Sequence, residues 1–170
     1  MKKKIKLLIF IVAYNAEKTI PSVINRIPKK ISTVYNLEVL IIDDCSEDRT
    51  FEISKKIKKN KKLGFHFNIL YNPINQGYGG NQKIGYHYAI KKKFDYVVLL
   101  HGDGQYAPEE LPKLMIGLEK NKYDVVMGSR MINKKNALKG GMPFYKLIGN
   151  IVLTKVQNFL LNTKLAEFHT

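Results

Sequence analysis

The amino-acid sequence predicts an α/β fold: a mainly parallel, open sheet with helices on both of its faces. Short apolar stretches suited to strands alternate along the chain with longer stretches of helical periodicity. The strand-like stretches are apolar at successive positions, as parallel strands are when helices bury both faces of a sheet. With 170 residues, of which 45% are hydrophobic, the chain is long enough to bury a substantial core.

The first strand is expected over residues 5–13, because every residue from Leu7 to Ala13 is apolar. A helix is expected over residues 17–30, where Pro21 falls in the first turn and its missing N–H does no harm. The second strand is expected over residues 38–42, which are again almost wholly apolar.

The second helix is expected to begin within residues 46–50, with Ser46 or Asp48 as its N-cap. A lysine-rich outer side then faces away from its apolar positions. The third strand is expected over residues 65–71. An Asn-Pro pair follows it and predicts a loop over residues 72–80.

A third helix is expected over residues 81–92 and a fourth strand over residues 94–100. Pro108, followed by two acids, predicts the start of a fourth helix, because proline and negative charge both suit a first turn. A short fifth strand is expected over residues 123–127. This order of elements is that of a parallel sheet connected by helices.

The pattern changes after residue 140. Residues 143–162 have the pattern of one helix rich in Ile, Leu, Val and Phe, which also carries Lys146 and Lys155. We therefore divide the chain into a domain over residues 1–140 and a helical tail over residues 141–170. So apolar a tail needs a cover, which is its own domain, a membrane surface or a continuation of the chain.

The chain is strongly basic, with 29 Lys and Arg against 14 Asp and Glu and a formal net charge of +15. Such a charge attracts nucleotide phosphates, anionic lipid or nucleic acid, and it equally describes a solvated lysine-rich surface. We expect no specific nucleic-acid partner, because no nucleic-acid-binding motif is present and aromatic residues are not interleaved with the lysines. The single cysteine, Cys45, excludes an internal disulfide and indicates a reducing compartment, the cytoplasm. The sequence does not indicate an oligomeric state.

Polar or glycine-containing clusters follow every expected strand. They are Ala13–Glu17, Asp43–Ser46, Asn75–Asn81, His101–Gln105 and Gly128–Arg130. In a parallel sheet these clusters emerge at one edge, where ligands of open α/β sheets bind. Each cluster by itself is weak evidence, and their agreement predicts a single cleft.

Asp103 is the most informative residue of these clusters. It is a lone acid between Gly102 and Gly104, which let the backbone turn sharply, and it has no evident capping role. His101 and Gln105 flank it, so a metal-bound, negatively charged ligand is expected here. His101 can also be interpreted as an ordinary histidine at a strand end.

The other clusters leave alternatives open. Asp43 and Asp44 could accept hydrogen bonds from a base or a ribose, or they could cap the following helix. Gly77, Gly79 and Gly80 could lie beside a ligand or only form a turn. They do not form the dinucleotide fingerprint G-x-G-x-x-G, because Gln82 stands where its third glycine would be. Arg130 could clamp a diphosphate or lie in an ordinary loop.

The motifs IVAYNAEKTI, VLIIDDCSEDRT, NQGYGGN, LLHGDGQYAPEEL and DVVMGSRM occur in that order. As a set they resemble family 2 glycosyltransferases, which have the GT-A nucleotide-sugar-binding fold. The resemblance is greatest to the branch of dolichol-phosphate mannosyltransferase-like enzymes, and it runs from Ile9 to the last residue. In similar proteins the stretch like residues 165–170 continues into acceptor-side sequence, so we expect this chain to be truncated there.

The resemblance implies transfer of a sugar from a UDP- or GDP-sugar to an acceptor, by metal-assisted displacement with inversion. The implied nucleotide-sugar-binding residues are Val12, Ala13, Tyr14, Asn15, Glu17, Asp43, Asp44, Gly77, Gly79, Lys83, Gly102 and Arg130. Asp103 and Arg130 are the implied catalytic residues. Asp103 would hold the divalent metal, Mn²⁺ or Mg²⁺, with His101 and Gln105 as further ligands.

Two positions depart from the family pattern. His101 stands at the first acid of the family's Asp-x-Asp metal motif, and Ala16 stands where the family often has an acid. An imidazole ligand would shift the preference from Mg²⁺ towards Mn²⁺.

The acceptor expected from the resemblance is a polyprenyl phosphate or a glycan. A hydroxyl acceptor needs a general base, for which the sequence offers no candidate, whereas a phosphate is already ionised. A lipid phosphate also agrees with the basic surface and the apolar tail, and it predicts peripheral contact with the inner face of the cytoplasmic membrane in cell-envelope glycan synthesis. The alternatives are a non-catalytic nucleotide-sugar-binding domain and a basic nucleic-acid-binding module.

Overall fold

The structure, a computed structural model, describes residues 4–60, 63–119, 123–129, 131–132, 138 and 142–168. The chain divides into two compact units, Met1–Lys113 and Leu114–Thr170.

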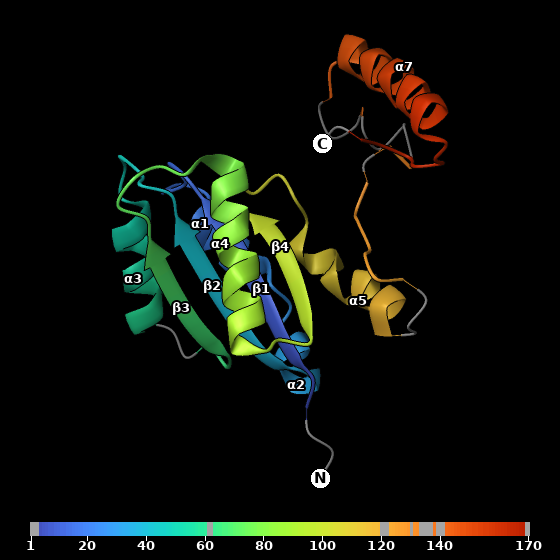
Figure 1. The fold of residues 1–170 in the computed structure, drawn as a ribbon. Coiled ribbons are helices and arrows are strands. Elements are labelled where there is room, and N and C mark those ends of the chain that lie inside the picture. The colour runs from blue at the N-terminus through green and yellow to red at the C-terminus, as the bar shows by residue number, and fades with distance from the viewer. Residues whose placement is uncertain are drawn as a thin grey trace. The chain divides into compact units, whose positions relative to one another are not determined.

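The first unit is built on a sheet of four parallel strands (Figure 1). The strands are β1 (Lys6–Ala13), β2 (Asn36–Asp43), β3 (His66–Tyr71) and β4 (Tyr96–His101). Their order across the sheet is β3-β2-β1-β4, so β1 and β2 lie in the centre. All three pairings are parallel, and the four strands therefore end at the same edge of the sheet.

Helices cover both faces of this sheet, which confirms the expected fold class (Figure 1). One face carries α4 (Gly77–Lys92), and the other carries α1 (Ile20–Arg26), α2 (Lys30–Val34) and α3 (Thr50–Asn60). Alternation along β1 fills both layers. Leu8, Phe10 and Val12 belong to the core cluster that includes Ala89 of α4, and Leu7, Ile9 and Ile11 are also fully buried.

Gly85 allows α4 to lie close to the central strand. A Cβ atom built on Gly85 would be 2.5 Å from two carbons of the Phe10 ring, which is fully buried on β1. The glycine is therefore required by the close approach of helix and sheet. Phe10 also makes an edge-on contact with the ring of Tyr86 on the same helix, with ring centroids 5.2 Å apart.

The prediction of a single helix over residues 17–30 is wrong in its extent, because the structure has two shorter helices, α1 and α2, with a break between them. Pro28 follows the end of α1 and has no N–H to continue it. It also disfavours the helical conformation of the residue before it, and Ile27 is extended, with φ −65° and ψ 119°. The chain then resumes a helical conformation in α2.

The helix after β3 begins at Gly77, four residues before the expected start. The Asn75 side chain makes this possible, because its Oδ1 accepts a hydrogen bond from the Gly77 N–H at 2.8 Å. The glycines that were expected in a loop therefore form the first turn of α4. A left-handed φ of +69° at Gly77 agrees with a glycine at this position.

The short strand expected over residues 123–127 is not present. Residues 123–129 are described and irregular, and the sheet contains none of them. A strand exists only where its backbone groups pair with a neighbouring strand, and apolar, β-branched composition does not replace that pairing. Val125 and Met127 are correspondingly exposed.

The remaining elements are a 3₁₀ turn, η1 (Pro108–Glu110), and two helices, α5 (Leu111–Glu119) and α7 (Phe144–Leu161). Proline and two acids open η1 as expected. The boundary between the two units falls within α5. Among the described residues, no helix is both long and apolar enough to cross a membrane.

The second unit holds a small core and a buried acid. Met131 and Leu147 are buried in one apolar cluster, and Met142 and Ile151 pack against it. Glu167 is only 6% exposed and accepts hydrogen bonds from Ser129 Oγ at 2.8 Å and from Asn150 Nδ2 at 3.2 Å. These bonds join the segment after α7 to Ser129 and to α7 itself.

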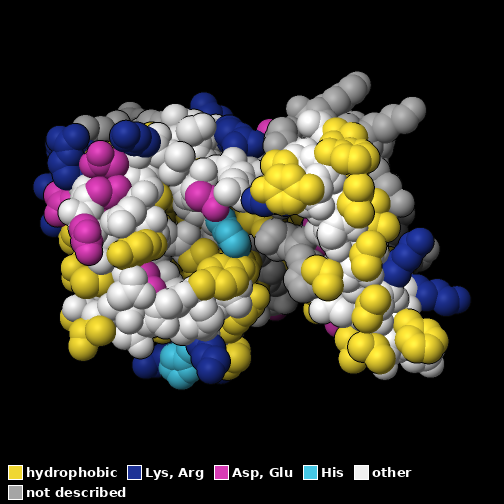
Figure 2. Space-filling view, turned by 90° about the horizontal axis from the view of Figure 1, so that it is seen from above, with side chains coloured by type: hydrophobic (Ala, Val, Ile, Leu, Met, Phe, Trp, Pro, Cys, Tyr) yellow, Lys and Arg dark blue, Asp and Glu magenta, His cyan; other side chains and the backbone are white. Residues whose placement is uncertain are grey.

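Much of α7 is nevertheless exposed and apolar. Figure 2 shows apolar side chains gathered on the surface of the second unit. The most exposed large ones on α7 are Phe159, Leu160, Tyr145 and Phe144. This helix therefore presents an uncovered apolar surface within the part of the chain that the structure describes.

We predict that Gly85→Ala lowers the free energy of unfolding by about 1–3 kcal/mol, because the new methyl group would overlap the Phe10 ring. Urea unfolding followed by circular dichroism measures the change. Gly79→Ala, in the same helix but with nothing within 4 Å of the added Cβ, is the matched control and should not destabilise the chain. Equal stabilities of the two variants would contradict the proposed close packing.

Candidate functional site

The candidate site is the edge of the sheet where the four parallel strands end. The registers pair Ala13 of β1 with Asp43 of β2, Asp43 with Tyr71 of β3, and Val12 with His101 of β4. The loops expected to carry chemistry therefore start side by side. The structure brings together four of the five predicted clusters. Of the fifth, Gly128 and Ser129 belong to the second unit, and Arg130 lies outside the described residues.

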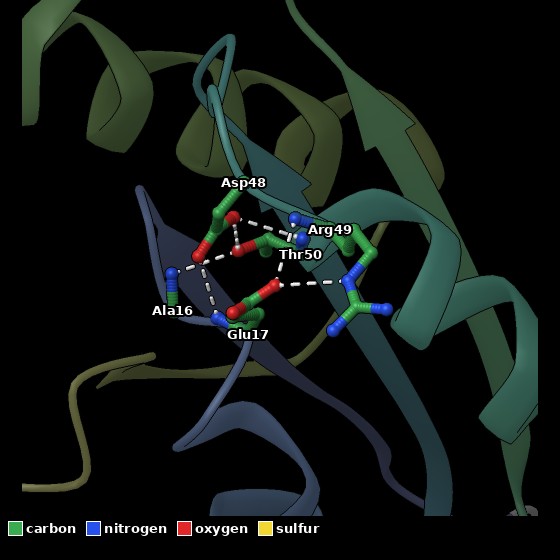
Figure 3. A network of polar contacts seen from close by, with 5 residues as sticks. All are labelled: Ala16, Glu17, Asp48, Arg49 and Thr50. Carbon is green, nitrogen blue, oxygen red and sulfur yellow. Dashed lines mark hydrogen bonds and ion pairs between the residues drawn. The ribbon is translucent and has the colours of Figure 1, made fainter.

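The loops after β1 and β2 are joined by a network of hydrogen bonds (Figure 3). The Ala16 N–H donates to Thr50 Oγ1 at 2.7 Å, and the Glu17 N–H donates to Asp48 Oδ2 at 2.9 Å. In return, the backbone N–H and Nε of Arg49 donate to Glu17 Oε2 at 3.1 and 3.3 Å. The two loops are thus held as one unit.

Asn15 adds a second link between these loops. It has a left-handed φ of 49°, which asparagine tolerates better than most residues. Its N–H donates to Ser46 Oγ at 3.0 Å, and its Oδ1 accepts from the Glu47 N–H at 2.9 Å. Asn15 and Glu17, both predicted to bind the nucleotide, thus have side chains that hold the neighbouring loop. Tyr14 remains half exposed beside them.

Asp48 is the residue that caps α3. Its Oδ1 accepts from the Thr50 N–H at 2.9 Å, whereas the Ser46 hydroxyl is used by Asn15. Partial burial acts to raise the pKa of Asp48, but the hydrogen bonds from Thr50 and Glu17 outweigh it, and the pKa lies below its usual value of 3.8. Of the two N-cap candidates that the sequence offered, Ser46 and Asp48, the structure therefore uses Asp48.

Asp43 and Asp44 are both buried, but their surroundings differ. Asp43 Oδ1 accepts from the Ser46 N–H at 2.9 Å, and its Oδ2 has no partner among the described residues. Burial raises the pKa of Asp43 above 3.8, although the hydrogen bonds from Ser46 oppose the shift. A buried carboxylate oxygen without a donor is costly, and a ligand with an N–H or O–H group could supply one.

Asp44 instead anchors the loop after β3. Its Oδ1 accepts from Asn72 Nδ2 at 2.7 Å and from the Gln76 N–H at 2.9 Å. Neither acid caps the helix that follows β2, because Asp48 does so. That alternative is therefore wrong for Asp43 and Asp44.

The turn after β4 is fixed by contacts with the first strand and its loop. The Gly102 N–H donates to the Val12 carbonyl at 2.8 Å, and Thr19 Oγ1 donates to the Gly102 carbonyl at 2.6 Å. A Cβ at Gly102 would lie 3.2 Å from the Val12 oxygen and from Ala13 Cβ, so the turn leaves little room for a side chain. Gly104 has a left-handed φ of +77°. Both glycines are thus needed to present Asp103.

Asp103 and His101 are the acid and the imidazole that this turn presents. Asp103 is about half exposed, and its Oδ1 accepts from the Gln105 N–H at 2.9 Å. Its Oδ2 lies 4.0 Å from His101 Nδ1. Burial lowers the pKa of His101 below 6.5, although the Asp103 charge opposes this, so the imidazole is neutral at pH 7.

The pair formed by Asp103 and His101 fits a cation that is shared with a phosphate ligand. Among the described residues, no three His, Cys, Asp or Glu side chains cluster in a way that could hold a metal by themselves. Mg²⁺ in particular is usually held by one or two carboxylates together with substrate phosphates, at roughly 2.1 Å from each ligand atom. With Oδ2 and Nδ1 4.0 Å apart, Asp103 and His101 would have to move closer together to be adjacent ligands of one such ion.

Two tyrosines that the sequence motifs did not single out contact His101. Tyr78 Oη is 2.8 Å from His101 Nε2, and the Tyr106 ring centroid is 4.6 Å from that of His101. Tyr78 lies within the quoted motif NQGYGGN, but its partner is 23 residues away on another element. Of the other predicted residues, Gly77 and Gly79 lie in the first turn of α4, and Lys83 is exposed in the next turn of this helix. Gln105 is exposed in the turn with Asp103.

A hollow of the first unit lies away from this edge. It has a volume of about 640 Å³ and is lined by Lys6, Asn36 and His66, which begin three of the strands. Its lining contains no acid and none of the predicted site residues. The chemistry expected from the sequence is therefore at the opposite ends of the strands.

Comparisons with known proteins agree with this fold. A family model described as glycosyl transferase family 2 matches residues 8–167. UDP-N-acetylglucosamine--dolichyl-phosphate N-acetylglucosaminyltransferase of Methanococcus voltae is 30% identical over 167 residues, covering 92% of this chain and 63% of that protein. Dolichol-phosphate mannosyltransferase of Pyrococcus furiosus is 26% identical over 161 residues, covering 90% of this chain and 43% of that protein. The chain thus spans less than two thirds of the length of these relatives.

Among solved structures, the chain resembles S. aureus TarS 1-349 in complex with UDP. The TM-score is 0.50 at 19% sequence identity, and the match covers 75% of this chain and 39% of that one. At this level of identity the likeness supports the fold.

We predict opposite pH dependences for two acids of the loop after β2. Asp48→Asn should lower the free energy of unfolding by about 1–2 kcal/mol at pH 7, because the Glu17 N–H loses its charged acceptor. The native pKa of Asp48 is depressed, so its stabilisation is present above pH 3.8 and is lost as the pH falls through the lower, folded value. The difference from the native chain should therefore shrink in acid.

Asp43→Asn is the matched comparison. The free energy of unfolding of the native chain and of both variants is measured by urea titration from pH 3 to 7. The native pKa of Asp43 is raised, so the native chain loses stability as the pH rises from 3.8 through the folded value, and the variant does not. The variant should gain relative to the native chain over that range. Parallel pH profiles of the two variants would contradict both assignments.

Proposed function

Because the chain belongs to glycosyl transferase family 2, we propose that it serves in the transfer of a sugar from a nucleoside-diphosphate sugar to an acceptor. The donor would bind at the edge of the sheet described above. The observation that carries this proposal is the presentation of Asp103, about half exposed, in a glycine-flanked turn beside the loops of β1 and β2. The GT-A fold that the family implies agrees with the four-stranded parallel sheet.

The nucleoside would lie against the joined loops after β1 and β2. Tyr14 is half exposed there and offers an aromatic ring to a base. Asp43 is buried at the end of β2, and a base N–H or a ribose hydroxyl would satisfy its Oδ2, which has no partner among the described residues. The name of the Methanococcus relative gives a UDP-sugar as its donor. For this chain we propose a UDP- or GDP-sugar as the donor.

The diphosphate would lie near the turn after β4. Asp103, with His101 beside it, would hold Mn²⁺ or Mg²⁺, which as a Lewis acid neutralises charge on the departing nucleoside diphosphate. An imidazole in the ligand set favours Mn²⁺. Gly102 and Gly104 give this turn its shape, because a Cβ at Gly102 would meet Val12 and Ala13 and Gly104 has a left-handed φ. Arg130, outside the described residues, would add positive charge.

The acceptor we propose is a polyprenyl phosphate. Relatives are named for dolichyl phosphate, dolichol phosphate and undecaprenyl phosphate. The phosphate oxygen is already ionised, so it can displace the nucleoside diphosphate at the anomeric carbon, with inversion, without a general base. This agrees with the edge of the sheet, where Asp43 and Asp44 are both buried and Asp44 accepts hydrogen bonds from Asn72 and Gln76. The exposed apolar surface of α7 and the net charge of +15 suit contact with an anionic membrane.

A second candidate is a nucleotide-sugar-binding domain without catalysis. The observation in its favour is His101 at the position of a metal-binding acid, together with the lack of a three-residue metal cluster among the described residues. It predicts donor binding without release of nucleoside diphosphate. An active enzyme would both bind the donor and release nucleoside diphosphate from it.

We predict that one nucleoside-diphosphate sugar raises the melting temperature of the chain when Mn²⁺ is present. UDP-, GDP- and CDP-sugars are compared with and without the metal. A ligand at about 100 times its Kd adds about 2.7 kcal/mol to the free energy of unfolding. Asp103→Asn should remove the metal-dependent part of the shift, whereas Glu52→Gln, which changes the same charge on exposed Glu52 of α3, should retain it. The absence of any shift in the native chain would contradict the donor site.

We also predict transfer of the sugar to a lipid phosphate. The donor identified by the thermal shift, carrying a labelled sugar, is incubated with the chain and phosphatidylcholine vesicles, with and without a polyprenyl phosphate. Label should appear in the lipid fraction only when the polyprenyl phosphate is present. Transfer to a soluble sugar acceptor, with none to the lipid, would contradict the proposed acceptor class.

A further inference from the structure

We propose that Tyr78 is a positioning residue for the metal site. Its hydroxyl holds the His101 imidazole so that Nδ1 faces the Asp103 carboxylate and is available to the divalent cation. The inference rests on the proposed function of this edge of the sheet. It assigns a task to a helix residue that sequence analysis had placed only in a glycine-rich motif.

The two nitrogens of His101 face different groups. Nε2 lies 2.8 Å from Tyr78 Oη, in the first turn of α4. Nδ1 lies 4.0 Å from Asp103 Oδ2, in the turn after β4. A 180° flip of the ring would put carbon atoms at both places and would lose the hydrogen bond to Tyr78. The hydroxyl therefore selects the orientation in which a nitrogen faces the acid.

Two aromatic rings restrain the imidazole further. The Tyr78 and Tyr106 rings both meet it edge-on, with centroid distances of 5.0 and 4.6 Å and interplanar angles of 62° and 68°. The His101 side chain is 23% exposed. Packing thus limits the motion of the ring, but both orientations of a flipped ring have the same shape. Only a hydrogen bond distinguishes them.

A phenol hydroxyl suits this task because it can donate or accept. Without a cation, the Tyr78 hydroxyl donates to Nε2, and the single imidazole proton is on Nδ1, which faces the Asp103 charge. With a cation bound, Nδ1 would offer its lone pair and the proton would be on Nε2, which would donate to the Tyr78 oxygen. The imidazole carries one proton in both states, so the change needs no net uptake or release of protons.

The surroundings of Tyr78 agree with a neutral hydroxyl that can reverse its role. Partial burial of the largely exposed Tyr78 raises its pKa above 10, although the Gln82 side chain acts in the other direction. The Tyr78 hydroxyl can therefore donate to His101 or accept from it. An outer hydrogen bond of this kind fixes the tautomer of a metal-ligating histidine, and its loss typically weakens metal binding by 10- to 100-fold.

The experiment compares Tyr78→Phe with Tyr106→Phe. Both variants keep a ring against His101, but only the first removes the hydroxyl that contacts it. Mn²⁺ binding is measured by electron paramagnetic resonance, with the metal alone and with UDP or GDP. We expect the Mn²⁺ affinity to fall by about 10- to 100-fold in Tyr78→Phe and to stay within about twofold in Tyr106→Phe. In a His101→Ala background, Tyr78→Phe should have no further effect on Mn²⁺ affinity, because the hydroxyl acts through the imidazole.

The second readout is the tautomer of His101, from ¹⁵N chemical shifts of the protein without metal and with diamagnetic Mg²⁺. We expect a proton on Nδ1 in the metal-free native chain and on Nε2 with Mg²⁺. In Tyr78→Phe the metal-free preference should be lost. An unchanged tautomer together with native Mn²⁺ affinity in Tyr78→Phe would overturn the proposal.

The two readouts separate this proposal from the proposed function. If the native chain binds neither Mn²⁺ nor any nucleoside diphosphate, the donor site is refuted. The metal-free ¹⁵N spectra of native and Tyr78→Phe chains still decide whether the hydroxyl holds the ring. If the native chain binds Mn²⁺ and the nucleotide but Tyr78→Phe does so equally well, the donor site stands and the role of Tyr78 is refuted.

Discussion

The arrangement of the candidate site depends on the backbone hydrogen bonds that continue the parallel sheet beyond its strands. The Asp44 N–H donates to the Ala13 carbonyl at 2.9 Å, the Asn72 N–H to the Asp43 carbonyl at 2.8 Å, and the Gly102 N–H to the Val12 carbonyl at 2.8 Å. Each loop is therefore anchored at its first residue to the neighbouring strand. Because the strands are parallel, the loops meet at one edge, and their side chains are positioned by the sheet itself.

The acids at this edge divide their work between architecture and ligand binding. Asp44, Asp48 and Glu17 accept hydrogen bonds from backbone N–H groups of adjacent loops, and these bonds join the loops to one another. Asp103 is turned outward by two glycines and is about half exposed, beside an imidazole that burial keeps neutral. The rigid acids explain why the loops hold together, and the exposed one is where a cation and a diphosphate would be neutralised.

The second unit contributes features of a different kind. Its buried Glu167 is satisfied by Ser129 and Asn150, so the polar groups that hold this unit together are internal. The outer surface of α7 is apolar, and it lies on a chain with a net charge of +15. An apolar surface on a basic chain suits an interface between water and anionic lipid, where the proposed acceptor would be found.

The sequence by itself determined the parallel α/β class, the positions of four strands and the glycine-flanked Asp103. Hydrophobic periodicity and turn residues are local signals, and the rule that parallel strands end at one edge turns them into a site. Sequence also contained the signal that divides the first helix, Pro28, which the helical periodicity around it obscured. Only the tertiary structure decided that residues 123–127 form no strand and that Tyr78 meets His101. Both outcomes depend on which distant backbone or side chain lies within hydrogen-bonding reach, and packing alone sets that distance.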